Sequence, residues 1–190
     1  MQIKEFLISD IEAVKKFTDA QIGVGYYSFD ELKENQRKSV TTSGEISSFV
    51  LLDPTTQEVK GLRLAFPPGN WAGGKGAKLR PDLWPFQIHE AAYFQSLFLS
   101  AELQGQNWGP KLSQKSIEIF KKLGAKGIIT HSWKESPNNS SFRYLQKIGF
   151  HTIIEHPLYW IDVDYVCPRD GKPCRCTSIE MFLRFEKESA

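Results

Sequence analysis

Residues 104–112 read Gln104-Gly105-Gln106-Asn107-Trp108-Gly109-Pro110-Lys111-Leu112. They connect an apolar run at 92–99, which predicts a strand, to periodic apolar positions at 112–123, which predict a helix. The glycines and Asn107 permit a sharp bend, because Gly and Asn tolerate positive φ best. Pro110 suits the first helical turn, where its missing N–H costs nothing. Unpaired N–H groups at such a helix start bind anions, so the turn predicts a phosphate site.

The other apolar segments predict a chain in which strands and helices alternate. Capping residues Ser28 and Glu31 indicate one early helix, and Asn139 with Gly149 brackets another at 140–147. The strands that we expect besides 92–99 are 2–8, 47–52, 59–66, 126–131, 150–154, 158–166 and 179–185. The run at 126–131 is β-branched and fits a buried parallel strand.

Length and composition favour one ordinary globular domain over residues 1–190. A chain of this size can bury about 70% of its unfolded surface, and 24 basic against 22 acidic residues give a charge of only +2. This charge argues neither for nor against a polyanionic partner, and we expect no nucleic-acid partner. The first ten residues carry charges and lack a long apolar run, so we expect no signal peptide, no membrane association and a cytoplasmic location. The oligomeric state is open.

The segment around the turn resembles motif A of the GCN5-related N-acetyltransferases, Gln/Arg-x-x-Gly-x-Gly/Ala. Gln104 matches the first position and Gly109 the last, whereas Asn107 replaces the usual first glycine. The resemblance implies an α/β (α+β) fold with a mixed, mostly antiparallel central sheet flanked by helices. It also implies acetyl-CoA bound along the central strand and at the turn. The residues concerned are Leu97, Leu99, Gln104, Gly105, Gln106, Asn107, Trp108, Gly109, Pro110 and Lys111.

Residues 138–150 resemble motif B of the same family, Asn-x-x-Ala-x-x-x-Tyr-x-x-x-Gly-Phe. Counting back from Gly149, the Asn that contacts the cofactor falls on Asn138 and the small residue on Ser141. The Tyr that protonates the leaving thiolate falls on Leu145, with Tyr144 one position away. Because neighbouring helical residues point about 100° apart, this shift leaves the general acid open.

Four side chains are candidates for proton transfer: Glu90, Tyr93, His131 and Tyr144. Tyr93 is also a candidate wall of the acceptor pocket. His131 follows a predicted parallel strand at its carboxyl end, the edge where open sheets bind ligands. Structural alternatives are a surface pair for Glu90 and a satisfied buried ring for His131. The Gly- and Pro-rich insertion at 67–85 is either a solvated loop or a lid over a substrate pocket.

All three cysteines lie within residues 167–176, an odd number that does not indicate a disulfide framework. Cys167, Cys174 and Cys176 are candidate ligands of a structural zinc ion, with Asp170, His156 or His151 as the fourth ligand. The alternative is three unligated thiols in a loop that keeps the shape of a metal knuckle.

The sequence thus predicts an enzyme that moves an acetyl group from acetyl-CoA directly to an amine of a small molecule or peptide. Cysteines distant from both motifs argue against an acyl-enzyme. Two other classes are open: a non-catalytic acyl-CoA-binding or sensing domain, which Leu145 in the Tyr position favours, and a zinc-dependent nucleic-acid module, which needs a basic surface.

Overall fold

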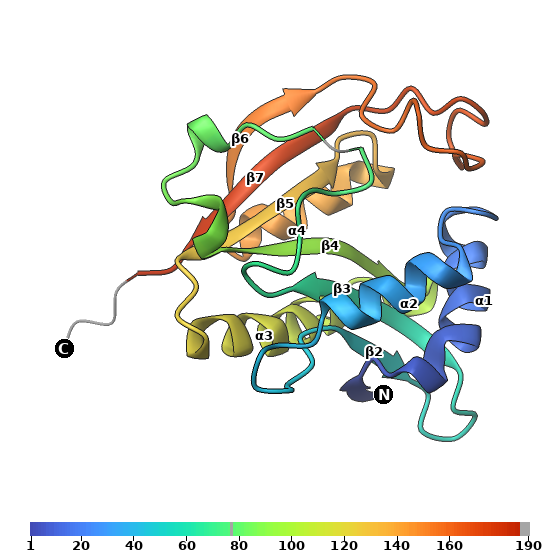
Figure 1. The fold of residues 1–190 in the computed structure, drawn as a ribbon. Helices are drawn as coiled ribbons and strands as arrows, with labels where there is room; N and C mark the ends of the chain where they lie inside the picture. The colour runs from blue at the N-terminus through green and yellow to red at the C-terminus, as the bar shows by residue number, and fades with distance from the viewer. Residues whose placement is uncertain (77, 187–190) are drawn as a thin grey trace.

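A computed structural model describes residues 1–76 and 78–186, which form one seven-stranded sheet (Figure 1). Its strand order is β1-β2-β3-β4-β5-β7-β6. Only β4 and β5 pair in parallel, and every other neighbouring pair is antiparallel. The predicted mixed, mostly antiparallel sheet is therefore confirmed. The strands are β1 (Gln2–Glu5), β2 (Phe49–Leu52), β3 (Val59–Phe66), β4 (Ala91–Leu99), β5 (Gly127–Trp133), β6 (His151–His156) and β7 (Ser178–Arg184).

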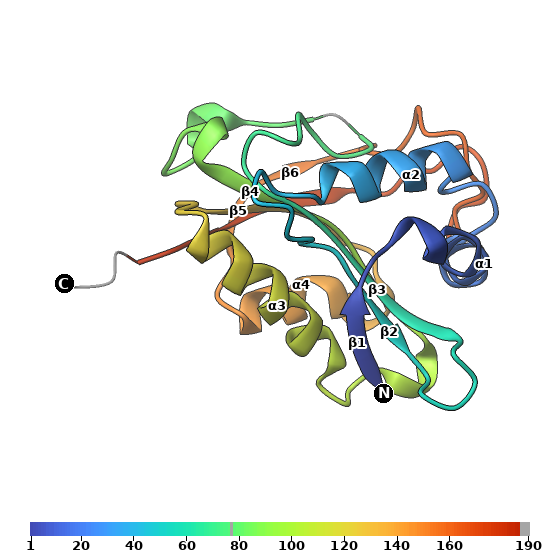
Figure 2. The same ribbon diagram turned by 60° about the horizontal axis from the view of Figure 1, so that its bottom comes forward.

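Four α-helices cover the two faces of the sheet (Figure 2). They are α1 (Ile11–Ile22), α2 (Phe29–Lys38), α3 (Trp108–Lys122) and α4 (Ser140–Lys147). α1 and α2 lie on one face and α3 and α4 on the other. The predicted cap of α2 is confirmed, because Glu31 N–H donates to Ser28 Oγ over 3.1 Å. Among the described residues, no helix is both long and apolar enough to cross a membrane.

The alternation of side chains along β4 divides the core between these two faces. Ala92 and Phe94 pack with α3 and α4, in a cluster that includes Phe120 and Leu145. Tyr93 belongs to the opposite cluster, with apolar residues of α1 and α2. We call these the α3/α4 face and the α1/α2 face.

The 67–85 insertion packs over the α1/α2 face and is not a free loop. Trp71 Nε1 donates to Ala91 O over 2.8 Å, and the Trp71 ring stacks on Tyr93 with centroids 4.6 Å apart. Trp84 Nε1 donates to the fully buried Glu180 of β7 over 2.5 Å. The two tryptophans therefore anchor the segment. Ala77 of this insertion lies outside the described residues.

Two sequence-based expectations about the elements are corrected. Residues 158–166 form turns rather than a strand, and Leu158 has φ +54°. This segment contacts the cysteine loop, where Tyr165 O–H donates to Cys174 Sγ over 3.2 Å. Helix α3 begins at Trp108, two residues before the expected start at Pro110.

Phe94 tests the core of the α3/α4 face. The ring is fully buried between Phe120 and Phe150, with centroids 6.1 and 5.9 Å away. We expect Phe94→Ala to lower the free energy of unfolding by about 3–5 kcal/mol, because it leaves a cavity. Phe29→Ala, at a 48% exposed position, should cost only about 0.5 kcal/mol. Urea denaturation measures both, and equal losses would contradict this assignment.

Candidate functional site

The parallel strands β4 and β5 separate partway along their length. They pair only from Ala91 with Gly127 to Phe94 with Thr130, where Thr130 Oγ1 also donates to Phe94 O over 2.9 Å. Beyond this point β4 continues to Leu99 and β5 to Trp133 as the two strands diverge (Figure 1). We call the space that they leave the β4–β5 opening.

A β-bulge in β4 accompanies the separation. Leu64 of β3 pairs with Ser96 and Ala65 pairs with Phe94, so Gln95 is an additional residue. Further along, Ser100 N–H donates to Lys60 O across β3. Because alternate N–H groups of a strand point to opposite edges, those of Leu97 and Leu99 face the β4–β5 opening. The structure thus places backbone donors where the sequence predicted cofactor contacts.

The predicted phosphate-binding turn leads directly into α3. Gly105 and Asn107 adopt φ of +77° and +65°, which confirms that the bend requires positive φ. Trp108 and Gly109, as the first residues of the helix, have N–H groups without an intrahelical acceptor. Two other positions contribute no free donor, because Gln106 N–H donates to Leu103 O and Pro110 has no N–H.

Close contact between α3 and β4 depends on Gly109. A Cβ atom there would lie 3.1 Å from Leu97 Cδ2 and 3.6 Å from Tyr144 Cε2. A surface groove of about 630 Å³ runs along α3 from the turn. Lys111 lines this groove and places its Nζ 4.2 Å from the centroid of Trp108. A cation and free N–H groups thus lie together at the start of α3. Gln104 is exposed beside them.

The second motif lies beside the carboxyl end of β5. Ser132 Oγ of β5 donates to Ser141 Oγ of α4 over 3.1 Å, and Asn138 precedes this helix with φ +54°. Both motifs therefore flank the β4–β5 opening, one on each strand.

A buried arginine, which the sequence analysis missed, lies behind the opening on the α3/α4 face. Arg63 of β3 is 2% exposed, and its guanidinium donates to Ser113 Oγ over 2.7 Å, to Tyr144 Oη over 3.1 Å and to Ser96 O over 3.2 Å. Ser113 and Tyr144 also bond to each other. No carboxylate among the described residues pairs with Arg63, and burial lowers its pKa. Leu145, which stands at the Tyr position of the second motif, packs in the apolar core of the α3/α4 face.

A second polar network lies on the α1/α2 face. His131 Nε2 is 2.9 Å from Lys78 O, so this nitrogen carries the proton, and Nδ1 accepts the Tyr93 hydroxyl at 2.8 Å. Burial lowers the pKa of His131 to about 3 and raises the pKa of Tyr93 well above its usual value. The pair is therefore a neutral imidazole that accepts from a protonated phenol.

Glu180 and His156 extend this network. Glu180 Oε1 accepts from Trp84 Nε1 and from Arg80 N–H, and Oε2 lies 2.5 Å from His156 Nε2. The side chains of His131, His156 and Glu180 also satisfy the spacing of a metal site. Since their donor atoms already have hydrogen-bond partners, we assign this group to hydrogen bonding.

Glu90 is not brought together with the other candidates for proton transfer. It directly precedes β4 at the end where β4 and β5 are paired, and its carboxylate accepts from Gln87 N–H over 2.9 Å. Tyr93 and His131 lie on one face of the sheet near the opening, and Tyr144 lies on the other.

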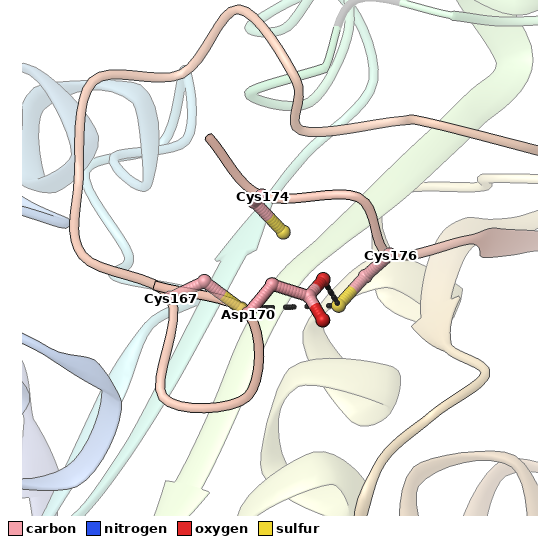
Figure 3. A group of neighbouring side chains, drawn as sticks. All are labelled: Cys167, Asp170, Cys174 and Cys176. Carbon is pink, nitrogen blue, oxygen red and sulfur yellow. Dashed lines mark hydrogen bonds between the residues drawn. The ribbon is translucent and has the colours of Figure 1, made fainter. Parts of the chain in front are cut away.

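The cysteine loop brings together four side chains, which we call the cysteine cluster (Figure 3): Cys167, Asp170, Cys174 and Cys176. His156 bonds to Glu180 instead, and His151 is exposed on β6. Of the three candidates for a fourth ligand, the structure therefore places Asp170 beside the thiols.

Comparison with known proteins identifies the fold. No family model and no curated protein matches the sequence. Among solved structures, the ribosomal-protein-S18-alanine N-acetyltransferase from Escherichia coli aligns with TM-score 0.66 and 14% identity over 100% of this chain and 97% of that chain. A GCN5-related N-acetyltransferase from Kribbella flavida aligns with TM-score 0.59 and 18% identity over 97% of each chain.

A third structure, yncA from Salmonella typhimurium with acetyl-CoA, aligns with TM-score 0.63 and 16% identity over 100% of this chain and 96% of that chain. The chain therefore has the fold of the GCN5-related N-acetyltransferases.

The buried imidazole predicts a pH dependence of stability. His131 has a pKa of about 3 in the fold, below the 6.5 of an exposed histidine. The unfolded chain therefore binds an additional proton below pH 6.5, and stability that is fully present above this pH is lost toward pH 3. We expect a slope of up to about 1.4 kcal/mol per pH unit that His131→Gln removes.

Urea denaturation from pH 7.5 to 4.5 measures this difference. His151→Gln is the matched control, because the His151 ring is exposed. Parallel profiles for wild type and His131→Gln would contradict the assignment of a neutral, protected ring.

Proposed function

We propose that this chain is an N-acetyltransferase that moves the acetyl group of acetyl-CoA directly to an amine. The observation that carries the proposal is the β4–β5 opening, which has unpaired N–H groups of β4 along one side and the start of α3 at its end. A long, thin thioester fits such an opening as an additional strand, and its diphosphate fits the N-terminus of a helix.

Three features support this placement of acetyl-CoA. The N–H groups of Trp108 and Gly109 and the ammonium of Lys111 would meet the diphosphate. The N–H groups of Leu97 and Leu99 would bond to the pantetheine arm and to the thioester oxygen as it gains negative charge. Asn138, on the opposite side, would contact the same arm.

The polar groups on the two faces suit different parts of the reaction. The amine nitrogen bonds to the thioester carbon, the C–S bond breaks, and the amine gives up a proton while the thiolate takes one. We assign Tyr93 to orienting the amine, whose proton leaves through water. Burial raises the pKa of Tyr93 and lowers the pKa of His131 to about 3, so neither a phenolate nor an imidazolium is favoured there. Tyr144 would protonate the thiolate, whose charge Arg63 would stabilise.

One observation favours a non-catalytic acyl-CoA sensor as the second candidate. Tyr93 is 1% exposed, and a Cβ atom on Gly74 of the insertion would lie 2.2 Å from its hydroxyl oxygen. The insertion therefore covers the Tyr93 hydroxyl, and catalysis requires this segment to move when an amine binds. A sensor would bind acetyl-CoA without releasing thiol in the presence of any amine.

Charge reversal at the turn tests cofactor binding. We expect Lys111→Glu to raise the Kd of CoA at least tenfold, since it replaces attraction to the diphosphate with repulsion. Lys16→Glu, the same charge reversal at an exposed position of α1 on the opposite face, should change Kd less than threefold. Calorimetry measures both, and equal effects would remove the turn as the diphosphate site.

Loss of one hydroxyl tests catalysis. Tyr144→Phe keeps the ring beside Gly109 but removes the proposed acid, so we expect kcat to fall about 10- to 100-fold with little change in CoA affinity. Arg143→Ala, an exposed neighbour on α4, should behave as wild type. Thiol release is followed with peptide N-termini, lysine peptides and polyamines. No release with any of these amines, together with tight CoA binding, would favour the sensor.

A further inference from the structure

We propose that the cysteine cluster binds one structural Zn²⁺ ion, a site independent of the acetyl-transfer chemistry. Its four potential ligand atoms, three sulfurs and one carboxylate oxygen, all lie within 4.8 Å of one another. The three cysteines are 0–3% exposed and form no disulfide. Three buried cysteine sulfurs and a carboxylate in one loop form a donor set that suits zinc.

The spacing of the donor atoms matches a tetrahedron around zinc. Zn–S bonds of about 2.3 Å give tetrahedral edges of about 3.8 Å between sulfurs. Cys167 Sγ and Cys176 Sγ are 3.8 Å apart, and Cys176 Sγ is 3.3 Å from Asp170 Oδ2. Figure 3 shows that Cys174 directs its sulfur toward the other three side chains. An ion at the centre would thus meet all four ligands with little movement of the chain.

The backbone around Cys167 forms a tight turn that presents the first ligand. Cys167 N–H donates to Gly171 O over 2.8 Å, and Gly171 N–H donates to Cys167 O over 2.9 Å. Gly171 has φ +73°, which glycine adopts without strain. This turn therefore holds Cys167 at a fixed place in the cluster.

Two further groups near the cysteine cluster are hydrogen-bond donors. Tyr165 O–H donates to Cys174 Sγ over 3.2 Å. Trp133 packs against the buried residues that include Cys176, and its buried indole N–H has no hydrogen-bond partner among the described residues. A thiolate at Cys176 would supply that acceptor. A thiol is a weak hydrogen-bond acceptor and gains little from a donor beside it. Thiols that only filled space would therefore not need these donors.

The location of the cluster gives the ion a structural role. Residues 157–177 contain no helix and no strand, so their fold depends on side-chain contacts. This segment lies beside the end of α1, where a Cβ atom on Gly23 would be 2.3 Å from Val166 O. Tyr165 packs edge-on against Tyr26 with ring centroids 4.9 Å apart. An ion at the cluster would hold the segment against the connection between α1 and α2.

The first measurement uses the wild-type chain purified without chelator. We expect one equivalent of zinc by elemental analysis and a fall in melting temperature when EDTA removes the ion. Co²⁺ added to the stripped protein should saturate at one equivalent, with thiolate charge-transfer bands and the intense visible bands of tetrahedral cobalt. None of these readouts needs an amine or CoA, so failure of acetyl transfer would leave them unaffected.

Substitutions identify the ligands. Cys174→Ser should weaken zinc binding at least about 100-fold, more than loss of an outer-shell partner. Asp170→Cys completes a four-thiolate site and should retain zinc, with stronger charge-transfer absorption in the cobalt form. Asp164→Asn, an exposed carboxylate of the same segment, should match wild type. If Cys174→Ser fails to fold, the wild-type titration and Asp170→Cys still decide the question.

Two results would overturn the proposal. The first is a wild-type protein without stoichiometric zinc whose stripped form does not bind Co²⁺ and whose melting temperature is insensitive to EDTA. The second is a disulfide between two of the cysteines, found by mass spectrometry of freshly purified, unreduced protein.

Discussion

The early end of the parallel pairing between β4 and β5 is the constraint on which the rest of the structure depends. After four paired positions the strands diverge, and an unpaired backbone edge in a protein interior is costly unless another group bonds to it. The turn after β4 and the start of α4 lie at this same edge. The position of both sequence motifs, and the proposed place of acetyl-CoA, therefore follow from one interruption of the sheet.

Burial of Arg63 places a fixed positive charge behind the opening. Burying a guanidinium without an anion is unfavourable, and here neutral oxygens alone bond to it among the described residues. The same arginine lies 4.2 Å from the centre of the Phe94 ring, whose face attracts cations. The protein thus keeps a charge where a packed core would favour an apolar residue. In the proposed reaction, this charge would stabilise the negative charge of the leaving thiolate.

Local patterns in the sequence predicted most of the strands, the helices and the turn, because periodicity, capping and glycine geometry depend on neighbouring residues. The mixed, mostly antiparallel arrangement of the strands was implied by the resemblance to a known family. Contacts between distant segments could not be predicted in this way. The sequence pattern places Glu180 on the more polar face of its strand. In the structure, Trp84 of the insertion, almost 100 residues earlier, covers it and donates to its carboxylate. Arg63 stands in a strand where polar and apolar residues alternate, so nothing in the sequence pattern indicates that its side chain is buried. Apolar residues at 158–166 resemble a strand, but their packing partners are the cysteine loop and α1.

The additional residue in β4 also reverses which side chains face which helices. Before Gln95, even-numbered residues such as Phe94 face α3 and α4, whereas after it odd-numbered residues such as Leu97 do so. Phe98 consequently packs beside Tyr26 on the opposite face. Deleting this one residue would leave Phe94 and Ser96 opposite consecutive residues of β3, so the strand would become regular and the later side chains would keep their present faces. For anyone who aligns this strand with one that lacks the bulge, leaving out the one-residue gap would assign every later residue of the strand to the wrong face.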